Sequence, residues 1–164
     1  MSTPKPKDIG VIIARFQVDE LHLGHKHLIE HVLKRHRHVL ILLGVRHGGR
    51  TTRDPLTYEM REVMVRQAYP DPAITIAPIY DSPISHEEWS RDVDTVINEL
   101  FPGQGAILYG SRKSFIPLYT GAFPAEEIIP VYNGSGTALR EAITFPHTRD
   151  ARAALIYEIQ HRQE

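Results

Sequence analysis

Short apolar runs alternate along the chain with stretches whose apolar residues recur at helical spacing. The runs predict five strands, at 9–14, 38–44, 74–79, 105–109 and 127–131. Continuous apolar runs of this length are typical of strands that are covered on both faces. The intervening stretches predict helices over 25–37, 57–69 and 85–101, a short helix or turn over 111–119, and helices over 135–143 and 148–163.

This alternation predicts the fold class. Strands that are joined through helices form a parallel sheet with helices on both faces. We therefore expect an α/β fold: a single Rossmann-like three-layer sandwich with a five-stranded parallel sheet. Residues 1–8 are polar and contain proline, which indicates a flexible tail, and residues 9–164 are expected to form one domain that includes the C-terminal helix 148–163.

Composition and charge narrow the classes of partner. The net charge is −1 with histidine neutral, so nothing indicates a general nucleic-acid or membrane-surface binder. No apolar run approaches the roughly 20 residues that span a bilayer. The chain has no cysteine, which excludes disulfides and thiolate ligands and favours the cytoplasm. An anionic ligand must therefore be held by a local cluster of side chains.

The strongest candidate for chemistry is His22-Leu23-Gly24-His25, between the first strand and the first helix. A helix N-terminus reached through a glycine offers backbone N–H groups to a phosphate, and the two imidazoles add donors that can become charged. Alternatively, these are two of ten ordinary histidines. A metal site competes as well, because further histidines stand nearby, but without cysteine or a His-Glu-x-x-His motif we expect none. Those histidines are His27, His31, His36 and His38.

Two other segments could hold phosphate. The turn 134–137 combines glycines with hydroxyls, and Arg140 follows it, so backbone amides and a guanidinium could grip an anion together. An ordinary helix N-cap with a solvated arginine is the alternative. The loop 46–53 carries three arginines and two glycines after the second strand, and it either clamps phosphate or is a solvated loop. Strand ends share one edge of a parallel sheet, so these segments could converge there.

Such a set of side chains suits phosphoryl or nucleotidyl transfer. In these reactions catalysis consists mostly of positioning and of charge stabilisation, and no nucleophile triad is required. If the attacking group is a phosphate, its second pKa of ~6 leaves it largely ionised at neutral pH. The absence of an obvious general base is therefore consistent with this chemistry.

These motifs resemble those of the His-x-Gly-His nucleotidyltransferase superfamily. The closest resemblance is to archaeal-type nicotinamide mononucleotide (NMN) adenylyltransferases and to the adenylyltransferase half of bifunctional adenylyltransferase/Nudix proteins. Their pattern Gly-Arg-Phe-Gln-Pro-Phe-His-x-Gly-His is similar to residues 14–25. Further similar segments follow in the same order along the chain: Thr52-Arg53-Asp54-Pro55, Glu59-Met60-Arg61, Trp89, Gly110-Ser111-Arg112-Lys113, and Ser135, Thr137 and Arg140.

The resemblance implies that ATP and NMN are joined to give NAD and pyrophosphate, with Mg²⁺. It implies small-molecule substrates, without nucleic-acid or membrane partners, and it allows a homo-oligomer. The implied catalytic residues are His22, His25, Arg15 and Arg140. The implied ATP-binding residues are Phe16, Gln17, Gly24, Gly110, Arg112, Ser135 and Thr137. The implied acceptor-binding residues are Arg53, His86 and Trp89; Trp89 would stack on the nicotinamide ring or, alternatively, pack in the core.

The chain departs from the family pattern in two places. Val18-Asp19-Glu20-Leu21 replaces Pro-Phe, which lengthens the loop by two residues and adds two carboxylates that could assist Mg²⁺, repel ATP or face solvent. His86 stands where an asparagine often precedes the family's tryptophan. Two alternatives therefore stay open. One is a transferase with another phosphorylated acceptor (nicotinic acid mononucleotide, a pantetheine phosphate or a polyol phosphate), and the other is a non-catalytic nucleotide-binding regulator.

Overall fold

A single parallel sheet organises the protein. The computed structural model describes residues 8–48, 51–52, 54–111 and 114–129. Within them, five strands pair in the order β3-β2-β1-β4-β5, and every pairing is parallel. The strands are β1 (Ile9–Ala14), β2 (Val39–Val45), β3 (Ile74–Tyr80), β4 (Ala106–Gly110) and β5 (Ala125–Glu127). The helices are α1 (Leu23–Arg35), α2 (Tyr58–Ala68), α3 (His86–Leu100) and the short 3-10 helix η1 (Ile116–Leu118).

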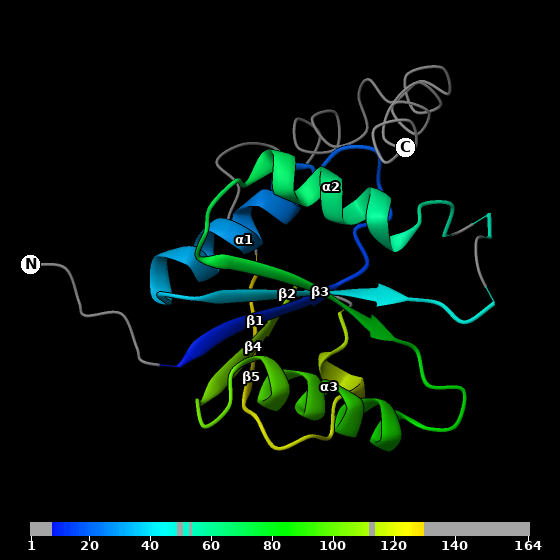
Figure 1. Cartoon of the computed structure of the whole chain (residues 1–164), viewed down its shortest axis with the longest axis vertical. Coiled ribbons are helices and arrows are strands. Elements are labelled where there is room, and N and C mark those ends of the chain that lie inside the picture. The colour runs from blue at the N-terminus through cyan, green and yellow to red at the C-terminus, as the bar shows by residue number, and fades with distance from the viewer. Residues whose placement is uncertain (1–7, 49–50, 53, 112–113, 130–164) are drawn as a thin grey trace, which may run out of the picture.

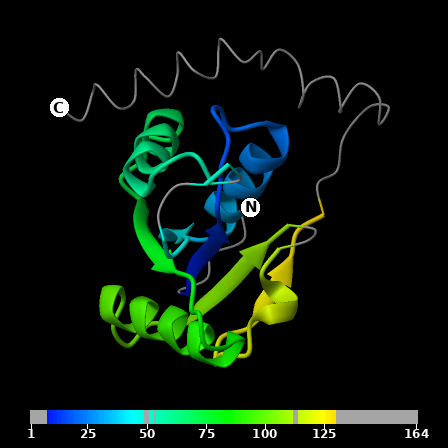
Figure 2. The ribbon, with the colours of Figure 1, turned by 90° about the vertical axis from the view of Figure 1, so that its right-hand side faces the viewer.

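The helices cover both faces of the sheet, which confirms the predicted α/β sandwich. Helices α1 and α2 lie on one face and α3 lies on the other (Figures 1 and 2). Because side chains alternate along a strand, Ile12 of β1 packs into the cluster beneath α1 and α2, whereas Val11 and Ile13 pack into the cluster beneath α3. Both clusters are needed to bury the central strands, so the continuous apolar runs were the right signal.

Two predicted boundaries were wrong. The first helix starts and ends two residues earlier than predicted, because His22 caps it and His36 ends it. The fifth strand, Ala125–Glu127, starts two residues before the predicted 127–131, and all three of its residues are exposed. Its position is set by backbone pairing with Leu108–Gly110 at the edge of the sheet, where a strand needs no apolar run. Residues 1–7 of the predicted tail 1–8, residues 130–131, and the helices over 135–143 and 148–163 lie outside the described residues.

The order of the strands decides where a ligand can bind. From β1 the chain moves outward to β2 and β3, then returns to the other side of β1 with β4. The connections therefore diverge between β1 and β4, at the point where open α/β sheets bind ligands beyond the carboxyl ends of their strands. The chain after β1 leads directly to the histidine motif at the start of α1.

Close packing fixes the end of α1 on the sheet. His36 is buried, and its Nδ1 donates to the carbonyl of Asp8 at 2.7 Å, while the hydroxyl of Tyr109 donates to its Nε2 at 2.6 Å. Gly10 makes room for this contact. A Cβ atom there would clash with Val32 and would lie 2.7 Å from Cδ2 of His36.

We predict that Gly10→Ala lowers the free energy of unfolding by about 2 kcal/mol, because overpacking a rigid core forces backbone shifts. Urea unfolding of the purified protein measures this value. Gly44→Ala is the matched control on the neighbouring strand, since its Cβ would lie 3.3 Å from Cγ of Arg15, a side chain that can move. A loss for Gly10→Ala no larger than that of the control would contradict the close approach.

Candidate active site

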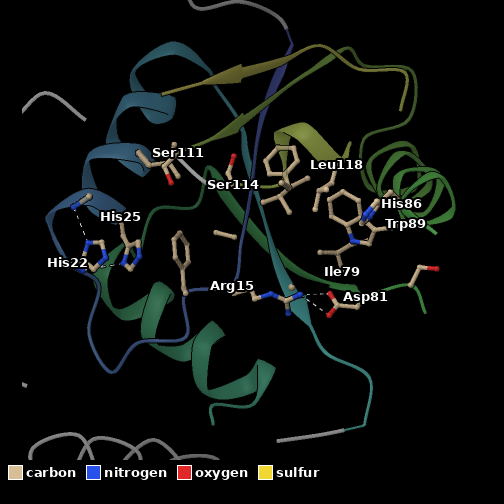
Figure 3. Close-up of a pocket in the computed structure, with 18 of the residues that line it drawn as sticks. Arg15, His22, His25, Ile79, Asp81, His86, Trp89, Ser111, Ser114 and Leu118 are labelled. Atoms are coloured by element: carbon tan, nitrogen blue, oxygen red, sulfur yellow. Dashed lines mark hydrogen bonds and ion pairs between the residues drawn. The ribbon is translucent and has the colours of Figure 1, made fainter. Parts of the chain in front are cut away.

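A cavity of about 820 Å³ opens at the carboxyl ends of β1, β2, β3 and β4. Two groups of side chains line its opposite sides (Figure 3). His22 and His25 lie at one side, His86 and Trp89 lie at the other, and the pair Arg15–Asp81 lies between them. The cavity is further lined by Ile13, Ala14, Phe16, Gly24, Leu28, Gly44, Ile79, Ser82, Ser85, Ser111, Ser114, Phe115 and Leu118.

The two histidines form the N-terminal cap of α1. The backbone N–H of Gly24 donates to Nδ1 of His22 at 3.2 Å, and the backbone N–H of His22 donates to Nδ1 of His25 at 3.4 Å. Their rings stack with centroids 3.5 Å apart at an interplanar angle of 23°. Because both Nδ1 atoms accept from backbone groups, the proton of each neutral ring is on Nε2. Each imidazole can therefore offer one Nε2–H to a ligand at a positive helix end.

Burial keeps the second of these rings neutral. Desolvation, together with repulsion from His22, lowers the pKa of His25 to about 3. At neutral pH, His25 is therefore a neutral hydrogen-bond donor in the free protein, rather than a cation. A polyanion bound beside it would favour the charged form and would raise this pKa.

The turn after β1 brings an aromatic ring against the histidines. Phe16 is 5% exposed and has a positive φ of 49°, which is unusual for a residue with a bulky side chain. This backbone conformation ends β1 abruptly. The ring of Phe16 then packs 4.8 Å from the ring of His25, between centroids, at 60°. The strained turn thus forms one wall of the histidine side of the cavity.

The cationic side chain in the middle of the cavity is held by a carboxylate. Nη2 of Arg15 donates to both oxygens of Asp81, at 2.7 and 2.8 Å. Arg15 crosses above Gly44, whose missing side chain leaves room for the guanidinium. Arg15 remains 46% exposed, so a stronger anion can compete with Asp81 for it.

The side of the cavity that contains Trp89 is held in place by packing and by hydrogen bonds. Trp89, on α3, is partly buried among core residues and lines the cavity as well, with its ring 6.2 Å from that of Phe115. The loop after η1 is tied to α3 by side-chain bonds: Tyr119 donates to Asp94, and the backbone N–H of Thr120 donates to Ser90 at 2.9 Å. Trp89 therefore packs against the core and also lines the cavity, and its stacking on a nicotinamide ring stays a prediction.

Comparison with known proteins bears on this arrangement. No protein-family model matches the sequence, and no curated protein does so either. Among solved structures, a bifunctional NMN adenylyltransferase/ADP ribose pyrophosphatase from Francisella tularensis is 23% identical, with a TM-score of 0.64 over 83% of this chain and 42% of that one. The same enzyme complexed with AMP and a manganese ion is 21% identical, with a TM-score of 0.62 over 83% and 41% of the two chains.

NadR protein in complex with NAD and AMP-PNP is also similar. It is 16% identical, with a TM-score of 0.56 over 97% of this chain and 43% of that chain. This chain therefore shares the α/β Rossmann-like fold of these proteins. It spans less than half the length of each of these proteins. The likeness therefore confirms, for the fold, the resemblance found in the sequence motifs.

Seven of the predicted site residues line the cavity. They are Arg15, Phe16, His22, Gly24, His25, His86 and Trp89. Two others do not. Both ends of the Gln17 amide are bonded to the backbone of Leu56, at 2.9 and 3.0 Å, so its assignment to ATP is not supported. Gly110 acts indirectly, because a Cβ there would collide with Ser114, which lines the cavity.

The remaining predicted residues lie outside the described part of the chain. They are Arg53, Arg112, Ser135, Thr137 and Arg140. The expected convergence of the second phosphate segment on the histidines is therefore still a prediction.

The inserted residues 18–21 fold partly into the core. Leu21 is buried in the core and Val18 packs against it, while Asp19 is buried as well. Neither Asp19 nor Glu20 is among the residues that line the cavity. Glu20 is exposed, which agrees with the alternative that it faces solvent.

Asp81 lines the cavity, but it was not selected in the sequence analysis. It directly follows β3 at the same sheet edge as the histidine motif, so the rule that selected residues at strand ends could have found it. It is the one carboxylate among the described residues that line the cavity, and both of its oxygens accept from Arg15.

This donor set fits a metal that arrives on a ligand. Among the described residues, no group of three or more histidine, aspartate or glutamate side chains could hold an ion. Mg²⁺ is commonly bound through substrate phosphates, with few protein ligands.

In the same described part of the chain, no helix is both long and apolar enough to cross a membrane.

We predict that the imidazole of His25 stays neutral, with its proton on Nε2, down to pH values well below the ordinary histidine pKa of 6.5. Nitrogen-15 NMR of the histidine rings measures both the pKa and the tautomer. A pKa close to 6.5 in the free protein would contradict the burial of this ring.

The same shift has a consequence for stability. The unfolded chain takes up a proton at His25 near pH 6.5, whereas the folded protein does so only near pH 3. The contribution of the neutral His25 ring to the free energy of unfolding is therefore complete above pH 6.5, and it is lost as the pH falls toward 3. We expect His25→Asn to flatten the decline in unfolding free energy over this range, as measured by urea unfolding at several pH values. An unchanged pH dependence would contradict the assignment.

Proposed function

We propose that this protein is an adenylyltransferase that joins ATP and NMN to give NAD and pyrophosphate. The observation that carries the proposal is one continuous cavity with two chemically different sides. A helix N-terminus with two stacked imidazoles suits a polyphosphate, and an aromatic side chain beside polar groups suits a flat ring. The fold similarity to NMN adenylyltransferases supports this assignment.

The proposed reaction is a direct displacement. A phosphate oxygen of NMN attacks the α-phosphorus of ATP, a new P–O bond forms, and the bond between the α-phosphorus and its bridging oxygen to the β-phosphate breaks. Pyrophosphate leaves with that oxygen and its electron pair. The attacking phosphate is already ionised near neutral pH, so no side chain has to remove a proton from it.

The role of the residues is to place and stabilise negative charge. The Nε2–H groups of His22 and His25 would donate to the triphosphate at the N-terminus of α1, where the helix dipole also favours an anion. Arg15 would exchange part of its pairing with Asp81 for the phosphates. Charge that develops during the displacement then meets donors already in place, which lowers the barrier without reorganisation.

Mg²⁺ would enter as the counter-ion of ATP, neutralising charge on the phosphates. The protein itself would be a cytoplasmic enzyme of NAD biosynthesis with small-molecule partners, which suits its cysteine-free sequence. The single domain 9–164 and the participation of Arg53, Arg112, Ser135, Thr137 and Arg140 belong to the same proposal.

A second acceptor deserves a direct test because His86 lines the acceptor side of the cavity. A histidine can be cationic, so it could pair with the carboxylate of nicotinic acid mononucleotide. Release of pyrophosphate from ATP and Mg²⁺ with each mononucleotide, at one enzyme concentration, separates the two acceptors. Tight nucleotide binding without pyrophosphate release from any acceptor would favour a regulator instead.

We predict that His22→Asn lowers kcat by about 10²-fold, the scale expected for losing one transition-state donor. Asparagine is a good N-cap residue, so α1 should keep its start and the melting temperature should stay close to that of the wild type. Steady-state pyrophosphate release gives kcat. A near-normal kcat would remove His22 from the proposed mechanism.

We predict that Trp89→Ala raises the KM for NMN by about 10-fold, equivalent to ~1.4 kcal/mol, and leaves the KM for ATP nearly unchanged. Trp89→Phe, which keeps an aromatic face, is the control and should lose less. A fall in melting temperature without a selective change in the KM for NMN would limit Trp89 to core packing.

A further inference from the structure

Arg61 is buried beneath the cavity and has an unusual set of partners. It lies on the first turn of α2, is 2% exposed, and is absent from the cavity lining. Its Nη1 donates to the carbonyls of Arg15 at 2.8 Å and Gly44 at 2.6 Å, and its Nε donates to the carbonyl of Thr57 at 3.2 Å. One guanidinium thus joins the ends of β1 and β2 to the start of α2.

The charge of Arg61 is costly where it lies. Its hydrogen-bond acceptors in the described part of the chain are all backbone carbonyls, so none brings a compensating charge. Burial and the neighbouring Arg15 lower the pKa of Arg61, and the opposing effects of Asp54 and Glu59 are smaller. A well-packed apolar side chain in place of a buried charge is often neutral or stabilising. Stability of the helix alone therefore does not account for an arginine at this position.

The bond to Arg15 acts on the most strained point of the site. The carbonyl of Arg15 belongs to the peptide that leads into Phe16, whose φ is positive. Left-handed backbone is costly for a non-glycine residue and persists only where surrounding contacts enforce it. Arg61 supplies such a contact from below. The ring of Phe16, held in this way, packs against His25.

We propose that Arg61 is a positioning residue that sets the geometry of the phosphate side of the cavity. It acts through the carbonyls of Arg15 and Gly44 and through Phe16 on the histidine pair, without touching a ligand. This inference rests on the proposed function for its kinetic consequence, but its structural consequence at His25 can be measured without turnover.

Arg66 provides a matched control on the same helix. It is also an arginine of α2 that donates to two backbone carbonyls, those of Asp71 at 3.0 Å and Ile74 at 2.7 Å. These acceptors lie just before β3 and at its first residue, at the amino ends of the strands, whereas the cavity lies at their carboxyl ends. Replacing Arg66 therefore removes the same kind of bond without altering the site.

The test compares Arg61→Lys and Arg61→Met with Arg66→Lys and Arg66→Met in the full chain. We expect kcat to fall by about 10²-fold in Arg61→Met and about 10-fold in Arg61→Lys, because small misplacements of reacting groups have effects of this size. Lysine keeps the charge but not the planar fork that fits two carbonyls. Both Arg66 variants should keep kcat within about twofold, whatever their melting temperatures.

Histidine NMR of the free protein gives a readout independent of activity. In the Arg61 variants, the pKa of His25 should rise by about one pH unit or more as its packing against Phe16 loosens, whereas the Arg66 variants should match the wild type. If the wild type releases no pyrophosphate, the proposed function fails and this comparison still decides the role of Arg61.

Three results would overturn the inference. The first is a kcat in the folded Arg61 variants that stays within about twofold of the wild type, as expected for the Arg66 variants. The second is an unchanged His25 signal in folded Arg61→Met. The third is failure of Arg61→Lys to fold, since Arg61 would then determine the fold rather than the site.

Discussion

The pairing of β1 with parallel neighbours on both sides is the constraint on which the site depends. β1 is flanked by β2 and β4 in the sheet and is buried on both faces, so its direction and register cannot vary. Its carboxyl end therefore delivers Arg15 and Phe16 to one fixed point. The connections to β2 and β4 diverge there, which leaves room for a cavity between the loops.

The site is prepared through neutral groups and backbone contacts rather than through many free charges. The described cavity lining contains one arginine, which is paired with Asp81. The stacked histidines are fixed by the helix cap, and burial lowers the pKa of His25. Among the described residues, this arrangement avoids repulsion between several cations that share one small space.

The two sides of the cavity are held by different means. The histidine side depends on the turn at Phe16 and on the hydrogen bond from Arg61 to the carbonyl of Arg15. The side that contains Trp89 depends on α3, to which the loop after η1 is bonded through Asp94 and Ser90. Different contacts thus hold the two sides in place.

The sequence by itself determined the α/β class and the bounds of β1, because apolar periodicity is a short-range property. It also placed the histidine motif at the carboxyl edge of the sheet. Only tertiary structure decided that His22 caps α1, that Gln17 bonds to Leu56, that Leu21 of the inserted loop is buried, and that β5 is an exposed edge strand. The roles of Asp81 and Arg61 were likewise hidden, since each depends on partners 66 and 46 residues away, which local patterns do not encode.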